Sequence, residues 1–175
     1  EVREKNRNRL AATLILTIPI IGITRVLANY LPYSARPINT PGLDVQLYPG
    51  QPEAALDGWS SMPSDHASLF MGLAVAYFLI NRKAGIIMIF WAIFVTSLPR
   101  VVVGLHWPSD VLVGWILGAA IVLALFKPTV ALIQRINLVG FFQARETLGY
   151  PLLFMATYEV ARLFHHTRKI VDSLI

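Results

Sequence analysis

Four long apolar runs constrain the fold of this chain more than any other feature of its sequence. They cover residues 10–31, 64–80, 84–103 and 108–126. Each run has roughly 17 to 22 residues, which matches the length of a helix that crosses about 30 Å of hydrocarbon. We therefore predict an all-α fold, a polytopic transmembrane helical bundle with at least four spans. Within the fourth run, Gly114-x3-Gly118 predicts close packing between two helices.

The composition agrees with a membrane protein. Only 14% of the 175 residues are charged, whereas soluble domains carry about 25%. The mean hydropathy is +0.58. This scarcity of polar side chains argues against a soluble enzyme, a disordered chain or a coiled coil. The sequence contains no Cys, which excludes disulfides, zinc–thiolate sites and cysteine catalysis.

The C-terminal part of the chain is expected to differ from the apolar part before it. We predict a membrane-embedded core over residues 1–128 and a cytoplasmic or interfacial helical tail over residues 129–175. Residues 148–164 are apolar but include Glu159 and Arg162, which favours an amphipathic helix lying on the membrane surface. Because the sequence does not begin with Met, we also expect that further helices precede it.

The distribution of basic residues predicts the orientation in the membrane. Twelve of the 15 Lys and Arg residues precede the first run, separate the second run from the third, or follow the fourth. These segments lie on the opposite side of the predicted spans from the long loop 33–62, and basic segments are typical of the cytoplasmic side. The loop is therefore expected outside the cell. Orientation explains the net charge of +5, and we expect no nucleic-acid partner.

Ionisable residues gather at the predicted outer ends of the spans, where charge is costly unless it has a function. They are Arg36, Asp65, His66, Arg100, His106 and Asp110. Arginine forks suit phosphate oxygens, a helix N-terminus binds anions, and two histidines are able to act as nucleophile and general acid. Asp110 lies four residues after His106, where its carboxylate is expected to hold the imidazole in one tautomer.

Three short motifs contain most of these residues. They are Asn29-x6-Arg36-Pro37, Pro63-Ser64-Asp65-His66 and Pro99-Arg100-x5-His106-x3-Asp110. The set resembles the signatures of the phosphatidic acid phosphatase type 2 superfamily, which read Lys-x6-Arg-Pro, Pro-Ser-Gly-His and Ser-Arg-x5-His-x3-Asp. The resemblance extends over about residues 29–126. It implies an integral membrane phosphatase that hydrolyses a lipid phosphate or diphosphate.

Motif by motif, the resemblance implies a role for each matching residue. His106 is implied to be the nucleophile that forms a phosphohistidine, with Asp110 orienting it and His66 protonating the leaving group. The residues implied to bind the phosphoryl group are Arg36, Ser64 and Arg100. The family's reaction implies no metal and no cofactor. The implied partners are the lipid bilayer and a membrane lipid that carries a phosphate or diphosphate headgroup.

The chain departs from the family signatures at three positions. Asn29 replaces the phosphate-binding lysine, Asp65 replaces the glycine and Pro99 replaces the serine. Weaker candidates for the anion site are Asn29, Asp65 and also Arg25, which lies one helical turn before Asn29. The Pro-Ser-Asp-His form resembles bacterial members that dephosphorylate undecaprenyl diphosphate, so this lipid is the expected substrate. The expected location is a bacterial plasma membrane, with the site facing the periplasm or exterior.

Two other functions stay open on the sequence alone. The same residues suit a lipid-linked phosphotransferase in which the acceptor is not water. The loss of the signature lysine also suits a membrane protein that binds a lipid phosphate without catalysis. Such a binding protein has little reason to retain His66, His106 and Asp110 together, which favours an enzyme. The sequence sets neither the lipid nor the oligomeric state.

Overall fold

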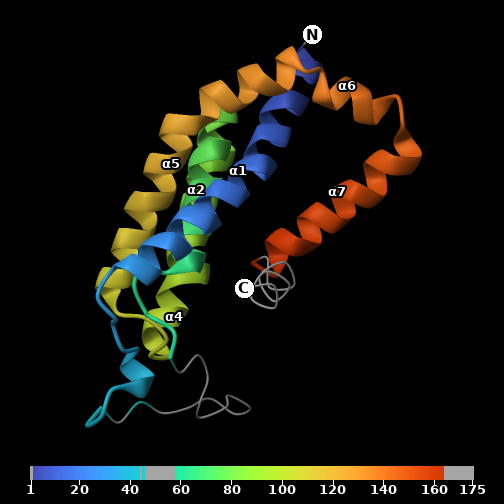
Figure 1. Cartoon of the computed structure of the whole chain (residues 1–175). Coiled ribbons are helices and arrows are strands. Elements are labelled where there is room, and N and C mark those ends of the chain that lie inside the picture. The colour runs from blue at the N-terminus through green and yellow to red at the C-terminus, as the bar shows by residue number, and fades with distance from the viewer. Residues whose placement is uncertain (1, 44, 46–57, 164–175) are drawn as a thin grey trace. The chain divides into compact units, whose positions relative to one another are not determined.

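The structure is a computed structural model of the whole chain, and it describes residues 2–43, 45 and 58–163. Every regular element in these residues is helical (Figure 1). The elements are α1 (Val2–Tyr30), the short 3-10 helix η1 (Pro37–Asn39), α2 (Asp65–Ile80), α3 (Arg82–Phe90), the π-helical segment η2 (Trp91–Ser97), α4 (Leu98–Val102), α5 (Pro108–Arg135), α6 (Leu138–Gln143) and α7 (Glu146–Ala161). The predicted all-α fold class is confirmed.

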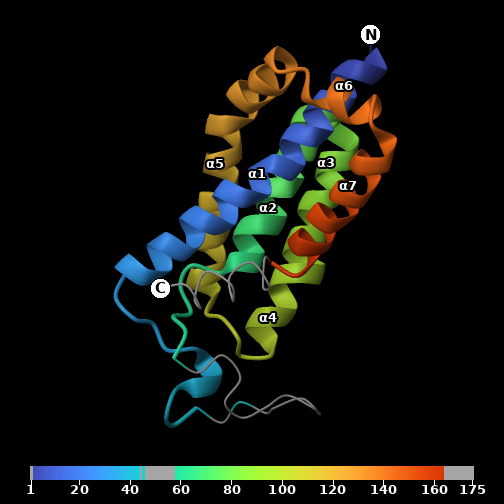
Figure 2. The same cartoon turned by 45° about the vertical axis from the view of Figure 1, so that its right-hand side comes forward.

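Among the described residues, three helical stretches are long and apolar enough to cross a membrane. They are Asn6–Tyr30, Arg82–Val102 and Pro108–Arg135. The second of these runs continuously through α3, η2 and α4 (Figure 2). The other predicted span, α2, is an apolar helix of 16 residues. At about 1.5 Å per residue it is about 24 Å long, which is shorter than the hydrocarbon layer. These helices identify the chain as a membrane protein.

The last long helix extends further than the sequence predicted. We expected α5 to end at Phe126, before Lys127 and Pro128, but it continues to Arg135. A proline inside a helix removes one hydrogen bond and costs about 3 kcal/mol. Ile133 lies beyond this proline and is only 2% exposed. Burial of its side chain and the remaining backbone hydrogen bonds favour continuation of the helix.

The chain forms two compact units, one of residues 19–123 and the other of residues 1–18 with 124–175. The second unit contains α6 and α7, and no residue of either helix is buried. The surface location of α7 and a functional division at residue 128 stay predictions. All the predicted site residues belong to the first unit.

Within the unit of residues 19–123, α2 packs tightly against the first half of α5. A Cβ atom on Gly114 would lie 2.8 Å from the carbonyl oxygen of Ser64, and one on Gly118 would collide with the carbonyl group of Ser68. Small residues thus let the two backbones touch, as the Gly-x3-Gly spacing predicted. This contact sets the first turn of α2 beside the first turn of α5, where the Ser64 N–H donates to the carbonyl of Asp110 at 3.2 Å.

A tight turn at Asn81 joins α2 to α3. The Asn81 side chain accepts hydrogen bonds from the backbone N–H groups of Lys83 and Ala84, at 3.0 and 3.2 Å, and so caps α3. Gly85 allows close approach of the two helices, because a Cβ atom there would collide with the backbone of Phe78. The turn lies at the opposite end of α2 from Ser64.

Candidate active site

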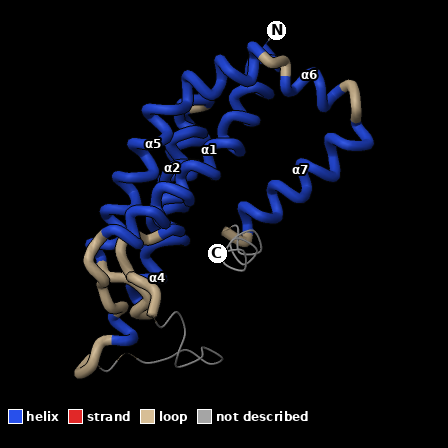
Figure 3. The backbone as a smooth tube through the Cα atoms, in the orientation of Figure 1, coloured by secondary structure: helices blue, strands red, loops and turns tan. Residues whose placement is uncertain are grey.

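Three loops meet at one end of the unit of residues 19–123 (Figure 3). One follows α1, one precedes α2 and one joins α4 to α5. The Ser61 N–H donates to the carbonyl of Ser34 at 2.8 Å, and the Ile38 N–H donates to the carbonyl of Gly104 at 2.9 Å. Gly104 has a φ of +69°, a left-handed conformation that favours glycine and lets the chain turn sharply after α4. These backbone bonds hold the three predicted motifs together.

His106 lies at the centre of this region, with only 4% of its surface exposed. Its Nδ1 atom lies 2.9 Å from the carbonyl oxygen of Ser61, which can only accept a hydrogen bond. Its Nε2 atom lies 3.2 Å from Nη1 of Arg36, which can only donate one. The two contacts together assign the proton to Nδ1 and the lone pair to Nε2. Nε2 is therefore the nitrogen able to act as a nucleophile.

Asp110 lies near His106 but does not form the expected hydrogen bond with its imidazole. Its Oδ2 atom accepts one hydrogen bond from the Ser61 hydroxyl and another from the Trp107 N–H at 2.8 Å. The same oxygen lies 3.8 Å from Nδ1 of His106, within ion-pair range but beyond hydrogen-bond distance. The Ser61 carbonyl accepts the hydrogen bond that orients the imidazole instead. The sequence did not predict this role, because the contact is made by a backbone atom that every residue has.

Arg36 is the buried cation of the site, with 4% of its surface exposed. Its guanidinium donates to the carbonyl oxygens of Leu105 at 2.7 Å and Ser60 at 3.5 Å, besides contacting His106. Burial lowers the pKa of Arg36 from its ordinary value, while the negative charges of Asp65 and Asp110 act in the opposite direction. An arginine starts from so high a pKa that it keeps its charge at neutral pH.

Among the buried side-chain atoms without a hydrogen-bond partner in the described residues are Nε of Arg36 and Oγ of Ser64. Ser64 is fully buried and occupies the N-cap position of α2, but its hydroxyl makes no capping hydrogen bond. Buried donors without partners are rare in proteins, and a helix N-terminus attracts anions. The two atoms thus fit an anion with several acceptor oxygens, such as a phosphoryl group.

His66 and Arg100 reach the same end of the unit through the backbone. His66 is the second residue of α2 and is half-buried. Arg100 lies in α4, and its carbonyl accepts the N–H groups of Leu105 at 2.9 Å and His106 at 3.2 Å. Within the third motif the chain therefore turns back, because the backbone N–H of His106 is hydrogen-bonded to the carbonyl of Arg100.

The π-helical segment η2 precedes α4 and is fixed to α5. The indole Nε1 of Trp115 donates to the hydroxyl of Ser97, the last residue of η2, at 3.0 Å. π-helical turns change the direction of the following residues and are frequent near functional sites. Here the segment sets the rotational position of α4, and with it that of Arg100.

A family model described as the PAP2 superfamily matches residues 32–133, which is more than half of the chain and includes all three loops. The chain belongs to the PAP2 superfamily. The resemblance predicted from the three motifs is confirmed.

Two relatives agree with this membership. The PAP2 chain is 32% identical over 116 residues to a protein named undecaprenyl-diphosphatase from Sulfolobus acidocaldarius, a match that covers 66% of this chain and 53% of the relative. It is 36% identical over 67 residues to the bacitracin transport permease protein BcrC of Bacillus licheniformis, which covers 38% of this chain and 32% of the relative. The chain thus spans about half the length of the first relative and less of the second. No solved structure matches it.

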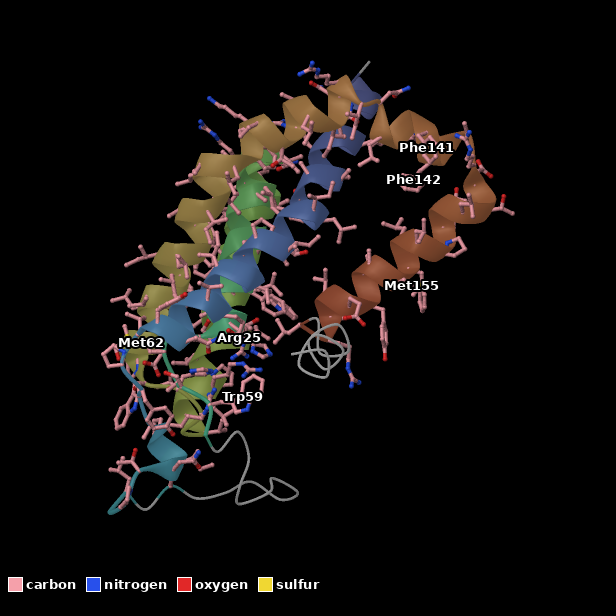
Figure 4. All side chains as sticks on the ribbon, in the orientation of Figure 1. Arg25, Trp59, Met62, Phe141, Phe142 and Met155 are labelled. Carbon is pink, nitrogen blue, oxygen red and sulfur yellow. The ribbon has the colours of Figure 1, made fainter. Side chains whose placement is uncertain are left out.

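Two residues at which this PAP2 chain departs from the signatures, Asn29 and Asp65, differ in whether their side chains reach the site. Asn29, in place of the lysine, is exposed near the end of α1. Arg25, one turn earlier, forms an ion pair with Asp65, and its guanidinium carbon lies 4.6 Å from the centre of the Trp59 ring. Figure 4 shows Arg25 and Trp59 close together beside the first turn of α2. The structure therefore brings Arg25 and Asp65 to the site but not the side chain of Asn29.

The donor set of this PAP2 site suits an anion better than a cation. The described residues contain no group of three or more His, Asp or Glu side chains that could hold a metal ion. Arg36 contacts the buried histidine instead, and the N-terminus of α2 lies in the same region. Arginines and helix N-termini both favour phosphate oxygens.

Proposed function

We propose that this protein is an integral membrane phosphatase that hydrolyses a lipid diphosphate or phosphate, with undecaprenyl diphosphate as the preferred substrate. The observation that carries the proposal is the position of His106 between the carbonyl of Ser61 and the guanidinium of Arg36. These partners place the lone pair of Nε2 beside a cation, and the lone pair becomes available to attack phosphorus when the guanidinium turns its N–H groups to the phosphate oxygens.

In the proposed first step, Nε2 of His106 attacks the terminal phosphorus in line with the oxygen that leaves. The N–P bond forms as the P–O bond breaks, and protonated His66 gives its proton to the departing lipid oxygen. The groups that stabilise charge on the equatorial oxygens are Arg36, Arg100 and the Ser64 hydroxyl. In the second step, water attacks the phosphohistidine, a histidine accepts its proton, and inorganic phosphate is released. No metal or cofactor takes part in the proposed reaction.

The substrate and the orientation rest on different grounds. The name of the Sulfolobus relative supports a polyprenyl diphosphate, as does the Pro-Ser-Asp-His motif. The distribution of Lys and Arg supports an extracytoplasmic site, because the basic segments lie at the other ends of the predicted spans. The lipid tail would then remain in the bilayer while its headgroup reaches the three loops. A bacterial source remains a prediction from the motif.

The proposal is tested by phosphate release from purified protein in detergent with EDTA present. The substrates are undecaprenyl diphosphate, undecaprenyl phosphate and phosphatidic acid. We expect metal-independent release of phosphate, fastest from the diphosphate, and its loss in His106→Ala. Arg82→Gln is the control, because Arg82 is exposed and lies at the start of α3.

Other outcomes identify the alternatives. Consumption of lipid with its phosphate appearing on a second lipid, and no free phosphate, supports the phosphotransferase. Binding of the lipids without any turnover supports the non-catalytic binding protein. Each of these results contradicts the phosphatase proposal.

A further inference from the structure

One ion pair beside the site has no role in the proposed reaction. Arg25 of α1 pairs with the carboxylate of Asp65, the first residue of α2. Neither residue belongs to the PAP2 signatures, since Asp65 stands where they have glycine and Arg25 lies outside them. The acid and the base that pairs with it are therefore additional to the signature residues, and they meet beside the phosphate-binding groups.

Asp65 places a negative charge close to the groups that are proposed to bind the phosphate. Asp65 lies between Ser64 and His66 in the chain, and its side chain is 8% exposed. It is also close enough to Arg36 for the two charges to interact. A buried carboxylate that lacks a counter-charge is unfavourable, and in a region of low dielectric constant it repels a neighbouring phosphate. An unpaired Asp65 would thus oppose the anion that the site is proposed to bind.

Arg25 is held where it offsets this charge. Its guanidinium contacts the Asp65 carboxylate and also lies over the Trp59 ring, at 4.6 Å from the ring centre. Figure 4 shows Arg25 beside Trp59. Trp59 belongs to the loop that supplies Ser60 and Ser61, so the same segment contacts Arg25 and Arg36. A cation that contacts both a carboxylate and an aromatic face is restricted in position, which keeps the carboxylate turned toward α1.

We propose that Arg25 is a positioning residue that neutralises Asp65 and turns its carboxylate away from the phosphate, which lets this site accept a highly charged headgroup. The inference rests on the proposed function, because it concerns the lipid phosphate that the enzyme binds. Without Arg25, the Asp65 carboxylate would repel the headgroup of the substrate, and this repulsion grows with the negative charge of the headgroup. Loss of Arg25 therefore weakens binding of a lipid diphosphate more than binding of the corresponding monophosphate.

The test compares Arg25→Gln, Asp65→Asn and the double variant on undecaprenyl diphosphate and undecaprenyl phosphate. Arg25→Gln is expected to raise the KM for the diphosphate at least about tenfold, and the KM for the monophosphate by less, with a smaller change in kcat. Asp65→Asn alone is expected to lower the KM for the diphosphate. Adding Asp65→Asn to Arg25→Gln is expected to restore most of the lost affinity, because the repelling charge is gone.

Two matched variants control for other effects. Arg25→Lys keeps the charge and is expected to retain the preference for the diphosphate. Arg82→Gln makes the same substitution at an exposed residue of α3 and is expected to leave both KM values unchanged. If Arg25→Gln does not fold, the double variant decides alone, and its KM must lie near that of the wild type.

Three results overturn the inference. They are an equal rise of both KM values in Arg25→Gln, a double variant no better than Arg25→Gln, and a folded double variant with wild-type kcat but low affinity. If the wild type releases no phosphate, the proposed function fails, and equilibrium binding of undecaprenyl diphosphate by the same variants then tests the inference. Binding that falls in Arg25→Gln and recovers in the double variant supports it, and binding that does not recover contradicts it.

Discussion

The Nη1 atom of Arg36 lies 3.2 Å from Nε2 of His106, although the two residues are 70 positions apart in the chain. Because a guanidinium only donates hydrogen bonds, this contact makes Nε2 an acceptor, and Nδ1 donates to the carbonyl of Ser61 at 2.9 Å. Arg36 therefore selects the tautomer of the histidine and also provides a cation for the phosphate. The first and third sequence motifs act as one unit through this contact.

Substitution of Arg36 by lysine is predicted to lower kcat/KM by at least about 100-fold, the loss typical for removal of a charge-stabilising donor. Lysine keeps the charge but lacks the second terminal nitrogen, which donates to the carbonyl of Ser60, and lacks the planar fork that suits phosphate oxygens. Initial rates of phosphate release in detergent provide the measurement, with Arg82→Gln as control. An Arg36→Lys enzyme as active as the wild type would show that the guanidinium fork is not needed.

Ser61→Ala separates the two functions of Ser61. The variant loses the hydroxyl that donates to Asp110 but keeps the carbonyl that accepts from His106. A lost hydrogen bond to a charged group costs about 1.5–3 kcal/mol, so we predict a kcat roughly 10- to 100-fold lower. Ser109→Ala is the matched control, since Ser109 is exposed one residue before Asp110. Wild-type kcat in Ser61→Ala would mean that the position of Asp110 does not depend on this hydroxyl.

The contact between α2 and α5 predicts a large difference between two glycine substitutions. Gly118→Leu places a side chain against the carbonyl group of Ser68, and we predict destabilisation of about 1–3 kcal/mol or more with loss of activity. Gly22→Ala meets no atom within 4 Å and is predicted to leave stability unchanged or raise it by up to about 1 kcal/mol. Thermal unfolding in detergent measures both. Equal melting temperatures for the two variants would contradict this packing.

Much of the fold was predictable because its determinants are local. The four apolar runs predicted α1, α2, the continuous stretch from α3 to α4, and α5, with approximate limits. The Gly114-x3-Gly118 spacing predicted a helix contact. The predicted end of α5 at Phe126 was wrong, because a proline weakens a helix without necessarily ending it. Whether a helix continues past Pro128 depends on the burial of residues beyond it, such as Ile133, which the local pattern does not contain.

The sequence predicted which residues lie together at one end of the helices but not which atoms they contact. The predicted spans and the motifs placed Arg36, His66, His106 and Asp110 at this end. His106 contacts the backbone carbonyl of Ser61, which lies 45 positions earlier in the chain. Every residue has such a carbonyl, so the residue type does not predict this contact. The choice between Arg25 and Asn29 was also beyond the sequence, since it depends on which side chain faces Asp65.

The orientation in the membrane gives a prediction that does not depend on activity. The chain contains no Cys, so single cysteines introduced at Leu43 and Lys83 are the only thiols. Both residues are exposed, one after η1 and the other at the start of α3. In intact cells, a membrane-impermeant maleimide is predicted to label Leu43→Cys, and to label Lys83→Cys only after permeabilisation. The reverse pattern would place the site on the cytoplasmic side.

A covalent intermediate on His106 distinguishes the proposed reaction from direct attack by water on the lipid phosphate. Wild-type protein is mixed with undecaprenyl diphosphate radiolabelled in its terminal phosphate, quenched within milliseconds in the presence of EDTA, and digested for peptide mapping. We predict an acid-labile, base-stable phosphohistidine on the peptide that contains His106, formed as fast as turnover and absent from His106→Ala. Turnover without a labelled intermediate, or undiminished phosphate release by His106→Ala, would contradict it.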